Sequence, residues 1–194
     1  MTAGLPLRLP PTLRWTETEF REWVKANPDL RWELTADGEP LAMPPTGGET
    51  GFYNANLNAN FILWNRQTAL GYVFDSSTGF RLPNGAIRSP AVAWIAKEKW
   101  DCLSLEECRG LVPLCPDFVV EILSPADDPN LVRAKMAEYL ANGARLGWLM
   151  DPQQQTVTIY RPGVAPRTQD VAVPLTGEEV LPGLVVNLTS LLGS

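Results

Sequence analysis

Runs of apolar residues along this chain predict a central sheet. The clearest run is 118–123, in which every residue except Glu121 is apolar and which lies between Pro116 and Pro125. Such a run is typical of a strand that is buried on both faces of a parallel or mixed sheet. Similar runs predict three further strands, at 91–95, 147–150 and 156–160. We expect these four strands to form one mixed sheet.

Helical periods predict the elements that cover this sheet. In residues 49–69, side chains recur at intervals of three or four residues, as on one face of a helix: Tyr53, Leu57, Phe61, Trp64 and Thr68. A second helix is expected at 129–141, because Asp128 can cap its start, Pro129 suits its first turn and Asn142-Gly143 can end it. The sequence thus predicts an α/β (α+β) fold, a mixed sheet with these helices on its faces.

Turn signals predict two hairpins in the first half of the chain. Asp37-Gly38 and Asn84-Gly85 are typical of tight hairpin turns. They predict paired strands at 31–35 with 39–43 and at 79–82 with 86–88. A capping box of Thr16 and Glu19 predicts a short helix at 17–26. The other expected elements are an extended arm at 1–14, a mixed helical connection at 97–109, a last strand at 171–173 and a turn over 181–192.

Length and composition narrow the class of protein. We expect 194 residues to form one domain, 1–194. Three cysteines without paired spacing indicate reduced thiols, and no secretory signal is present, so we expect a cytoplasmic protein. No window of about 18 uncharged apolar residues exists, so no membrane span is expected. The chain has no histidine, which excludes catalysis by a histidine base, and its net charge of −6 disfavours non-specific binding to nucleic acid.

Three charged residues are candidates for a site. Glu121 interrupts the buried strand, and a carboxylate there needs a cation, a donor cluster or a metal as its partner. Lys135 lies at the edge of the apolar face of the helix 129–141, so its stem can pack inward while its ammonium reaches over the sheet. Glu33 lies in the first hairpin. The residues alone leave the alternatives open: an ion pair for Glu121, a surface lysine for Lys135 and a surface carboxylate for Glu33.

Several segments together resemble one known family. The main ones are Pro116–Pro125 (PDFVVEILSP), Lys135–Tyr139 (KMAEY), and Asn142–Ala144 with Gly147–Pro152 (NGA and GWLMDP). They resemble a bacterial family of putative restriction endonucleases in the PD-(D/E)XK, or restriction-endonuclease-like, superfamily. The resemblance covers nearly the whole chain and implies a restriction-endonuclease-like mixed sheet flanked by helices, with extra N-terminal hairpins.

The resemblance also implies a chemistry, the metal-dependent hydrolysis of phosphodiester bonds in DNA. In such a site two carboxylates on adjacent strands hold Mg²⁺ or Mn²⁺, and a lysine orients the attacking water. Glu121 matches the second carboxylate, and Lys135 supplies the lysine from the following helix. Glu33 matches an N-terminal glutamate that joins or braces the metal site. We expect the ammonium of Lys135 within one water's reach of the Glu121 carboxylate.

Position 91 departs from the family pattern. The resemblance predicts Arg-Ser-Pro-Asp at the start of the strand before the nuclease motif, whereas this chain has Arg88-Ser89-Pro90-Ala91. Ala91 therefore leaves the first metal-ligand position vacant, and Mg²⁺ binding should be weak or lost. Asp117 is not a substitute, because four residues along a strand put it about 13 Å from Glu121. The alanine indicates either an inactive relative or a substitution introduced into the chain.

Three functions remain open at this point. The first is a metal-dependent endonuclease that is impaired at Ala91. The second is a catalytically inactive protein of the same fold, acting as a binding or scaffold subunit. The third is an acidic interaction protein in which Glu121 and Lys135 form a structural pair. DNA is the expected partner of the first, and the seven tryptophans suggest a homodimer face.

Overall fold

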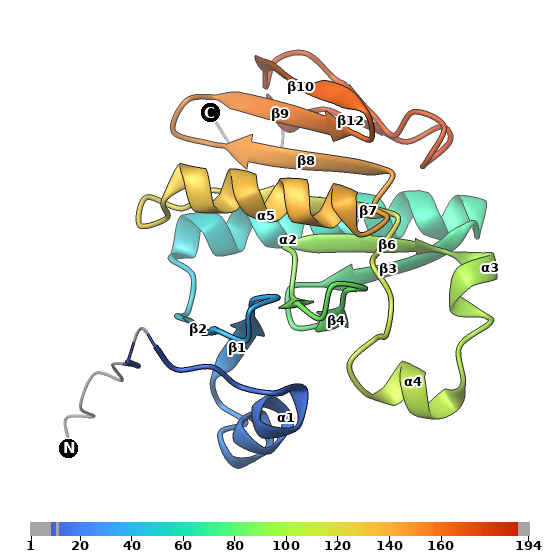
Figure 1. Ribbon diagram of the computed structural model, residues 1–194. Helices are drawn as coiled ribbons and strands as arrows, with labels where there is room; N and C mark the ends of the chain where they lie inside the picture. Colours follow the sequence, from blue (N-terminus) through green and yellow to red (C-terminus); the bar gives the residue numbers. More distant parts are fainter. Residues whose placement is uncertain (1–8, 11, 190–194) are drawn as a thin grey trace.

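A six-stranded mixed sheet runs through the computed structural model, which describes residues 9–10 and 12–189 (Figure 1). The strand order is β10-β9-β8-β7-β6-β3. The strands are β3 Gly71–Asp75, β6 Val92–Ala96, β7 Phe118–Ile122, β8 Leu146–Asp151, β9 Thr156–Arg161 and β10 Val164–Asp170. Among the described strands of this sheet, only β7 and β8 pair in parallel, and helix α5 (Pro129–Ala141) makes the crossover between them. The predicted mixed sheet of four strands is confirmed and extended at both edges.

The central strand β7 separates two hydrophobic layers. Side chains alternate along a strand, so Phe118 and Val120 face helix α2 (Gly48–Thr68), whereas Val119 faces α5. Figure 1 shows α5 in front of the sheet and α2 behind it. We call the two layers the α2-side cluster and the α5-side cluster. Both helices therefore lie where the sequence predicted them.

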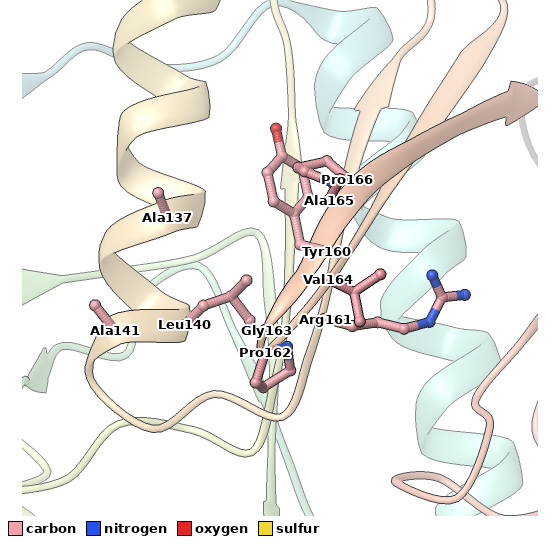
Figure 2. A pocket seen from close by; sticks show the side chains of 10 residues that line it. All are labelled: Ala137, Leu140, Ala141, Tyr160, Arg161, Pro162, Gly163, Val164, Ala165 and Pro166. Carbon is pink, nitrogen blue, oxygen red and sulfur yellow. The ribbon is translucent and has the colours of Figure 1, made fainter.

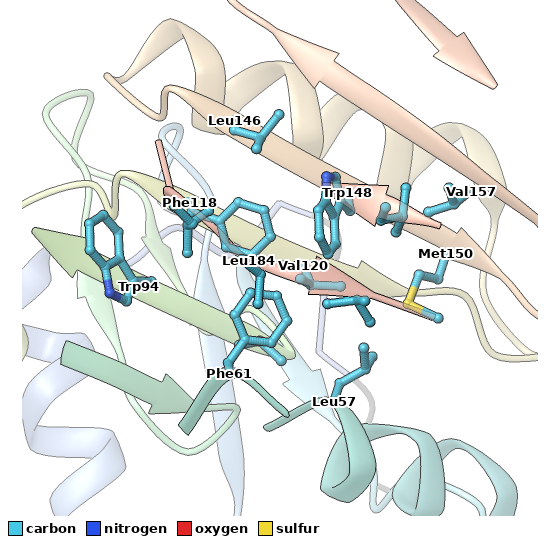
Figure 3. Close-up of a cluster of buried hydrophobic side chains, with 14 of the residues drawn as sticks. Leu57, Phe61, Trp94, Phe118, Val120, Leu146, Trp148, Met150, Val157 and Leu184 are labelled. Atoms are coloured by element: carbon cyan, nitrogen blue, oxygen red, sulfur yellow. The ribbon is translucent and has the colours of Figure 1, made fainter. Parts of the chain in front are cut away.

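Aromatic rings fill the centre of the α2-side cluster (Figure 3). Phe61 of α2 stacks on Phe118 with ring centroids 5.2 Å apart, and Trp148 of β8 meets Phe118 edge-on at 4.9 Å. All three side chains are fully buried. These contacts fix α2 against the middle of the sheet.

A second, four-stranded sheet in the order β2-β1-β5-β4 is built from the two predicted hairpins. Its strands are β1 Arg31–Leu34, β2 Pro40–Met43, β4 Phe80–Arg81 and β5 Ile87–Arg88. The hairpins pair with each other where Leu34 lies opposite Ile87. This pairing brings Glu33 of the first hairpin next to Arg88 of the second, although the two are 55 positions apart in sequence.

The remaining elements are short. They are α1 Glu17–Ala26, α3 Lys97–Trp100, α4 Leu105–Arg109, β11 Leu175–Thr176 and β12 Val185–Val186. The capping box of α1 forms as predicted, with Thr16 accepting from Glu19 N and Glu19 accepting from Thr16 N. Most of the expected arm at 1–14 lies outside the described residues, as does the end of the segment 181–192. Within the described part of the chain, no helix is both long enough and apolar enough to span a membrane.

The predicted strand at 171–173 is wrong. The chain turns there and buries Val171, and the last strand of the sheet is β10 instead. β10 is an edge strand with mostly exposed, polar residues and Pro166 in its middle, so it lacks the apolar alternation of a half-buried strand. Its pairing with β9 therefore rests mainly on main-chain hydrogen bonds, which the side-chain pattern does not predict, together with a side-chain hydrogen bond between Thr158 and Thr168.

The tryptophans do not form an outer face, so they give no support for a homodimer. Trp32, Trp64, Trp94 and Trp148 are buried, and Trp15, Trp23 and Trp100 are half-buried. Trp15, Trp23 and Trp32 pack on one another between α1 and β1, with ring centroids 5.2 to 5.9 Å apart. The tryptophan rings therefore contribute to packing inside the protein.

We predict that Phe118→Ala destabilises the protein by about 3–5 kcal/mol, because it removes the ring between Phe61 and Trp148 and leaves a cavity. Urea unfolding followed by circular dichroism measures this. Leu105→Ala on α4 is the matched control: Leu105 is 75 % exposed, and its truncation should change the free energy of unfolding by less than about 0.5 kcal/mol. Equal effects of the two substitutions would contradict the central position of Phe118.

Candidate functional site

Glu33 lies inside the protein, at the junction of the two sheets. Only 2 % of the residue is exposed, so the interpretation as a surface carboxylate is wrong. Its Oε1 accepts hydrogen bonds from the backbone N–H of Ser89 at 2.8 Å and from Lys135 Nζ at 2.7 Å, and its Oε2 accepts from Arg88 at 3.2 Å. The pairing of the two hairpins creates this environment, which strand periodicity in the first hairpin does not predict.

Lys135 joins the two glutamates that the sequence singled out. Its Nζ lies 2.7 Å from Glu33 Oε1 and 2.8 Å from Glu121 Oε1. The sequence predicted the ammonium within one water's reach of Glu121, and the structure confirms this with a direct contact. Lys135 comes from α5, and its side chain is 12 % exposed. The three candidate residues therefore form one cluster, contributed by β1, β7 and α5.

Tyr139 completes the surroundings of Glu121. Its hydroxyl donates to Glu121 Oε1 at 3.0 Å, and its ring lies 5.9 Å from Lys135 Nζ. Positions 135 and 139 are one helical turn apart, so both side chains leave α5 toward β7. Tyr139 is not among the three residues that the sequence singled out, although its spacing from Lys135 could have indicated it.

Arg88 and Glu138 extend the cluster on the side of Glu33. Arg88 Nε donates to Glu138 Oε2 at 2.6 Å while its Nη1 contacts Glu33, and Asn84 Nδ2 donates to Glu138 Oε1 at 3.0 Å. Arg88 is 8 % exposed. Neither Arg88 nor Glu138 is among the candidates that the sequence singled out. Arg88 stands directly before Ser89-Pro90, but its partners come from β1 and α5, and only the tertiary structure brings these together.

The two glutamates titrate differently because their partners differ. Burial acts to raise the pKa of Glu33, but the cations of Lys135 and Arg88 outweigh it, so this pKa lies below its ordinary value. Burial raises the pKa of Glu121 above its ordinary value, since Lys135 is its one close cation and the carboxylate of Glu33 adds to the shift. Both carboxylates overcome the effect of burial on Lys135 and raise its pKa. Lys135 is therefore held in its charged form.

Ala91 lies beside Glu121 in the sheet but belongs to the opposite hydrophobic layer. Val92 of β6 pairs with Val120 of β7, and the same register places position 91 next to Glu121. However, the chain bends at Ala91, and its methyl group is 7 % exposed within the α2-side cluster. The strand alternation thus does not extend to position 91. Asn58 of α2 donates to the Ala91 carbonyl at 3.2 Å.

The side chains present do not fit a two-carboxylate Mg²⁺ site. Glu33 and Glu121 each direct an oxygen at Lys135, an ammonium in the place where a cation would bind. Across residues 9–10 and 12–189, no three His, Cys, Asp or Glu side chains lie close enough to hold a metal ion. Asp117 does not supply the missing oxygen, because it accepts from Lys99 at 2.6 Å and from Ala96 N at 3.0 Å. A further acidic ligand near Glu121 is needed, as the sequence suggested for position 91.

Two cavities lie between α5 and the β9–β10 hairpin. In the first, of about 570 Å³, Ala137 and Leu140 of α5 lie across from Tyr160, Val164 and Pro166 (Figure 2). It is apolar and contains none of the three candidate residues, so it is not the candidate catalytic site. The second, of about 440 Å³, is more polar; it is lined by Leu123, Arg133, Leu149, Asp151, Gln154, Thr156, Thr158, Tyr160, Pro166 and Thr168.

The polar cavity lies one strand away from the carboxylate cluster. Leu149, which forms part of its wall, is the register partner of Glu121 on β8. Arg133 precedes Lys135 by two residues on α5 and is exposed. The guanidinium of Arg133 and the hydroxyl of Thr156 are donors of the kind that contact phosphate oxygens, whereas the hydroxyls of Thr158 and Thr168 bond to each other at 2.9 Å. Asp151 also lines this cavity, and its negative charge disfavours the binding of an anion.

Comparisons with known proteins agree with this fold. A family model described as Uma2, putative restriction endonuclease, matches residues 17–189. Among solved structures, the chain is similar to a putative nuclease belonging to DUF820 from Anabaena variabilis ATCC 29413. The two share 20 % sequence identity, with a TM-score of 0.71 over 83 % of this chain and 89 % of the other. That similarity shows the fold. No curated protein matches the sequence.

We predict that Glu33→Gln destabilises the protein by about 1–3 kcal/mol, because Lys135 and Arg88 each lose one of two buried carboxylates and keep only Glu121 and Glu138. The measurement is urea unfolding at pH 7. Glu17→Gln, the same substitution in the exposed Glu17–Arg21 pair, should cost less than about 1 kcal/mol. A similarly small cost at Glu33 would show that the buried cluster contributes little to stability.

We further predict opposite pH trends for Glu33→Gln and Glu121→Gln. The pKa of Glu33 is lowered in the fold, so its contribution is present above the ordinary value of 4.5 and is lost as pH falls through the folded pKa. The loss of stability caused by Glu33→Gln, relative to the unmodified chain, should therefore become smaller at acidic pH. The pKa of Glu121 is raised, so its contribution is full below 4.5 and is lost as pH rises through the folded pKa.

Stability curves for both variants and the unmodified chain, from pH 3 to 8, test this pair of trends. Relative to the unmodified chain, Glu121→Gln should gain stability as pH rises above 4.5. Parallel curves for the two variants would contradict the different titration of the two glutamates.

Proposed function

The chain belongs to the Uma2 family of putative restriction endonucleases, and on that premise we propose that it is a metal-dependent DNA endonuclease whose site is impaired at position 91. The observation that carries this proposal is the cluster of Glu33, Glu121 and Lys135 next to Ala91. Those residue types occur together in phosphodiester hydrolysis, where carboxylates hold Mg²⁺ or Mn²⁺ and a lysine stabilises negative charge.

Each side chain has a distinct part in the proposed site. Glu121 is the remaining metal-ligand carboxylate. Lys135, held in its charged form, provides an ammonium that can stabilise charge on a phosphate oxygen. Glu33, with Arg88 and Ser89 N, fixes the position of Lys135. A bound Mg²⁺ or Mn²⁺ ion would polarise the phosphate and activate the attacking water. With alanine at position 91, the site lacks one of the oxygen ligands needed to hold that ion.

The polar cavity beside Leu149 supports DNA as the substrate. Arg133 and the hydroxyl of Thr156 can donate to backbone phosphates one strand away from Glu121. The net charge of −6 makes non-specific affinity for DNA low, so binding should depend on this local cation.

A second candidate function is a non-catalytic binding or scaffold protein of the same fold. The observation that favours it is that Lys135 contacts both carboxylates directly, so each of them already has a cationic partner without an ion. In that case the cluster serves stability alone. Restoring the aspartate distinguishes the two functions.

We predict that the chain as it stands cleaves DNA at most slowly with Mg²⁺ or Mn²⁺, and that Ala91→Asp raises the rate on the order of 10² to 10³. The methyl group of Ala91 packs in the α2-side cluster, so the new carboxylate must turn out of that cluster toward Glu121. A bound ion favours this turn. The measurement is a nuclease assay of both chains with metal and with chelator.

Two controls accompany the assay. Glu121→Ala added to Ala91→Asp should abolish the gain. Thermal unfolding gives an independent readout: Ala91→Asp should be less stable than the unmodified chain in chelator and should regain stability with Mg²⁺ or Mn²⁺, since a ligand that binds only the folded state stabilises it. Equal inactivity of both chains, with no metal-dependent stabilisation, would leave the scaffold function. Rapid metal-dependent cleavage by the unmodified chain would mean that another residue, first of all Glu33, is the missing ligand.

A further inference from the structure

Helix α2 has a second apolar face, directed away from the sheet. Its inner face buries Tyr53, Leu57, Phe61 and Trp64 in the α2-side cluster. On the outer side, Phe52, Ala55, Ala59 and Ile62 follow one another at intervals of three, four and three residues, which is the spacing of a helix–helix seam. Phe52 is 55 % exposed and Ile62 is 39 % exposed, and the two alanines are exposed as well. We call these four residues the outer stripe.

The outer stripe is uncharged and flanked by opposite charges. No Asp, Glu, Lys or Arg occurs from residue 50 to residue 65. Leu63, 57 % exposed, widens the apolar surface beside Ile62. Glu49 stands at the N-terminal end and exposed Arg66 at the C-terminal end. A large apolar face of this kind on a helix is typical of a contact with another protein, because the core of an interface is depleted of charged residues.

We infer that a second copy of this chain docks on the outer stripe, with the two α2 helices antiparallel about a two-fold axis that passes between Ala55 and Ala59, at the level of position 57. The sequence of the stripe is nearly symmetric about that point, so Phe52 lies opposite the partner's Ile62 and Ala55 lies opposite the partner's Ala59. The same axis brings Glu49 to the end of the stripe where the partner's Arg66 lies. The stripe is therefore complementary to itself in shape and in charge, as a two-fold interface requires.

The small residues set how closely the helices can approach. Ala55 and Ala59 lie at the middle of the seam, where side chains would otherwise hold the axes apart, and helices with small contact residues approach to about 8 Å. The larger side chains of Phe52 and Ile62 then pack on each side of the axis. One helix from each copy makes a small interface, so we expect a reversible dimer with a dissociation constant on the order of 10 µM. This inference does not depend on the proposed nuclease activity.

Sedimentation velocity of the full chain from about 1 to about 100 µM tests the dimer. Ala59→Glu places two unpaired carboxylates in the seam and should weaken association at least about 100-fold. The matched control is Leu105→Glu on α4, which removes a 75 % exposed leucine elsewhere and should leave association unchanged. Circular dichroism and urea unfolding of each variant show whether the monomer fold is retained.

Charge reversal tests the antiparallel orientation. Arg66→Glu should weaken the dimer roughly tenfold at low salt, and Glu49→Arg added to it should restore association. A monomeric chain throughout the concentration range would overturn the inference. So would a dimer that survives Ala59→Glu, or one in which the double reversal fails to restore what Arg66→Glu removes.

Discussion

The rest of the structure depends on the need to neutralise Glu121 inside the central strand. A buried carboxylate is costly without partners, and here Lys135 and Tyr139 of α5 supply them. Lys135 in turn donates to a second carboxylate, Glu33 of the N-terminal hairpin. The cluster therefore connects β1, β7 and α5 through ion pairs, and Arg88 of the second hairpin joins it through its ion pair with Glu33.

The same cluster explains why the family relationship and the residues of the site point in different directions. The Uma2 family is one of putative restriction endonucleases, and the fold agrees with it. In this chain, however, the ammonium of Lys135 lies between the two glutamates, and an alanine stands at position 91. A cation site and an ion pair use the same carboxylates, so adding a ligand at position 91 should shift the balance between them.

Helix α2 shows how one element can serve two surfaces. Its inner face packs on the sheet through Phe61 and Trp64, whereas its outer stripe is apolar without a described partner element. Both faces follow the helical period, and together they occupy many positions of the helix, so fewer positions are left for charged residues. The fold of a single chain uses only the inner face of α2. The outer stripe is therefore available for the proposed association with a second copy.

The sequence by itself determined the central strands, the two covering helices, the hairpins and the three candidate residues, because these depend on local periodicity, on turn chemistry and on motifs that are continuous in the chain. Only the tertiary structure decided that Glu33 is buried, that Arg88 and Glu138 join the cluster and that β10 forms the sheet edge. The first two follow from the pairing of the two hairpins and the packing of α5 over it, which are long-range contacts. The third follows mainly from main-chain hydrogen bonding, which the side-chain pattern does not predict.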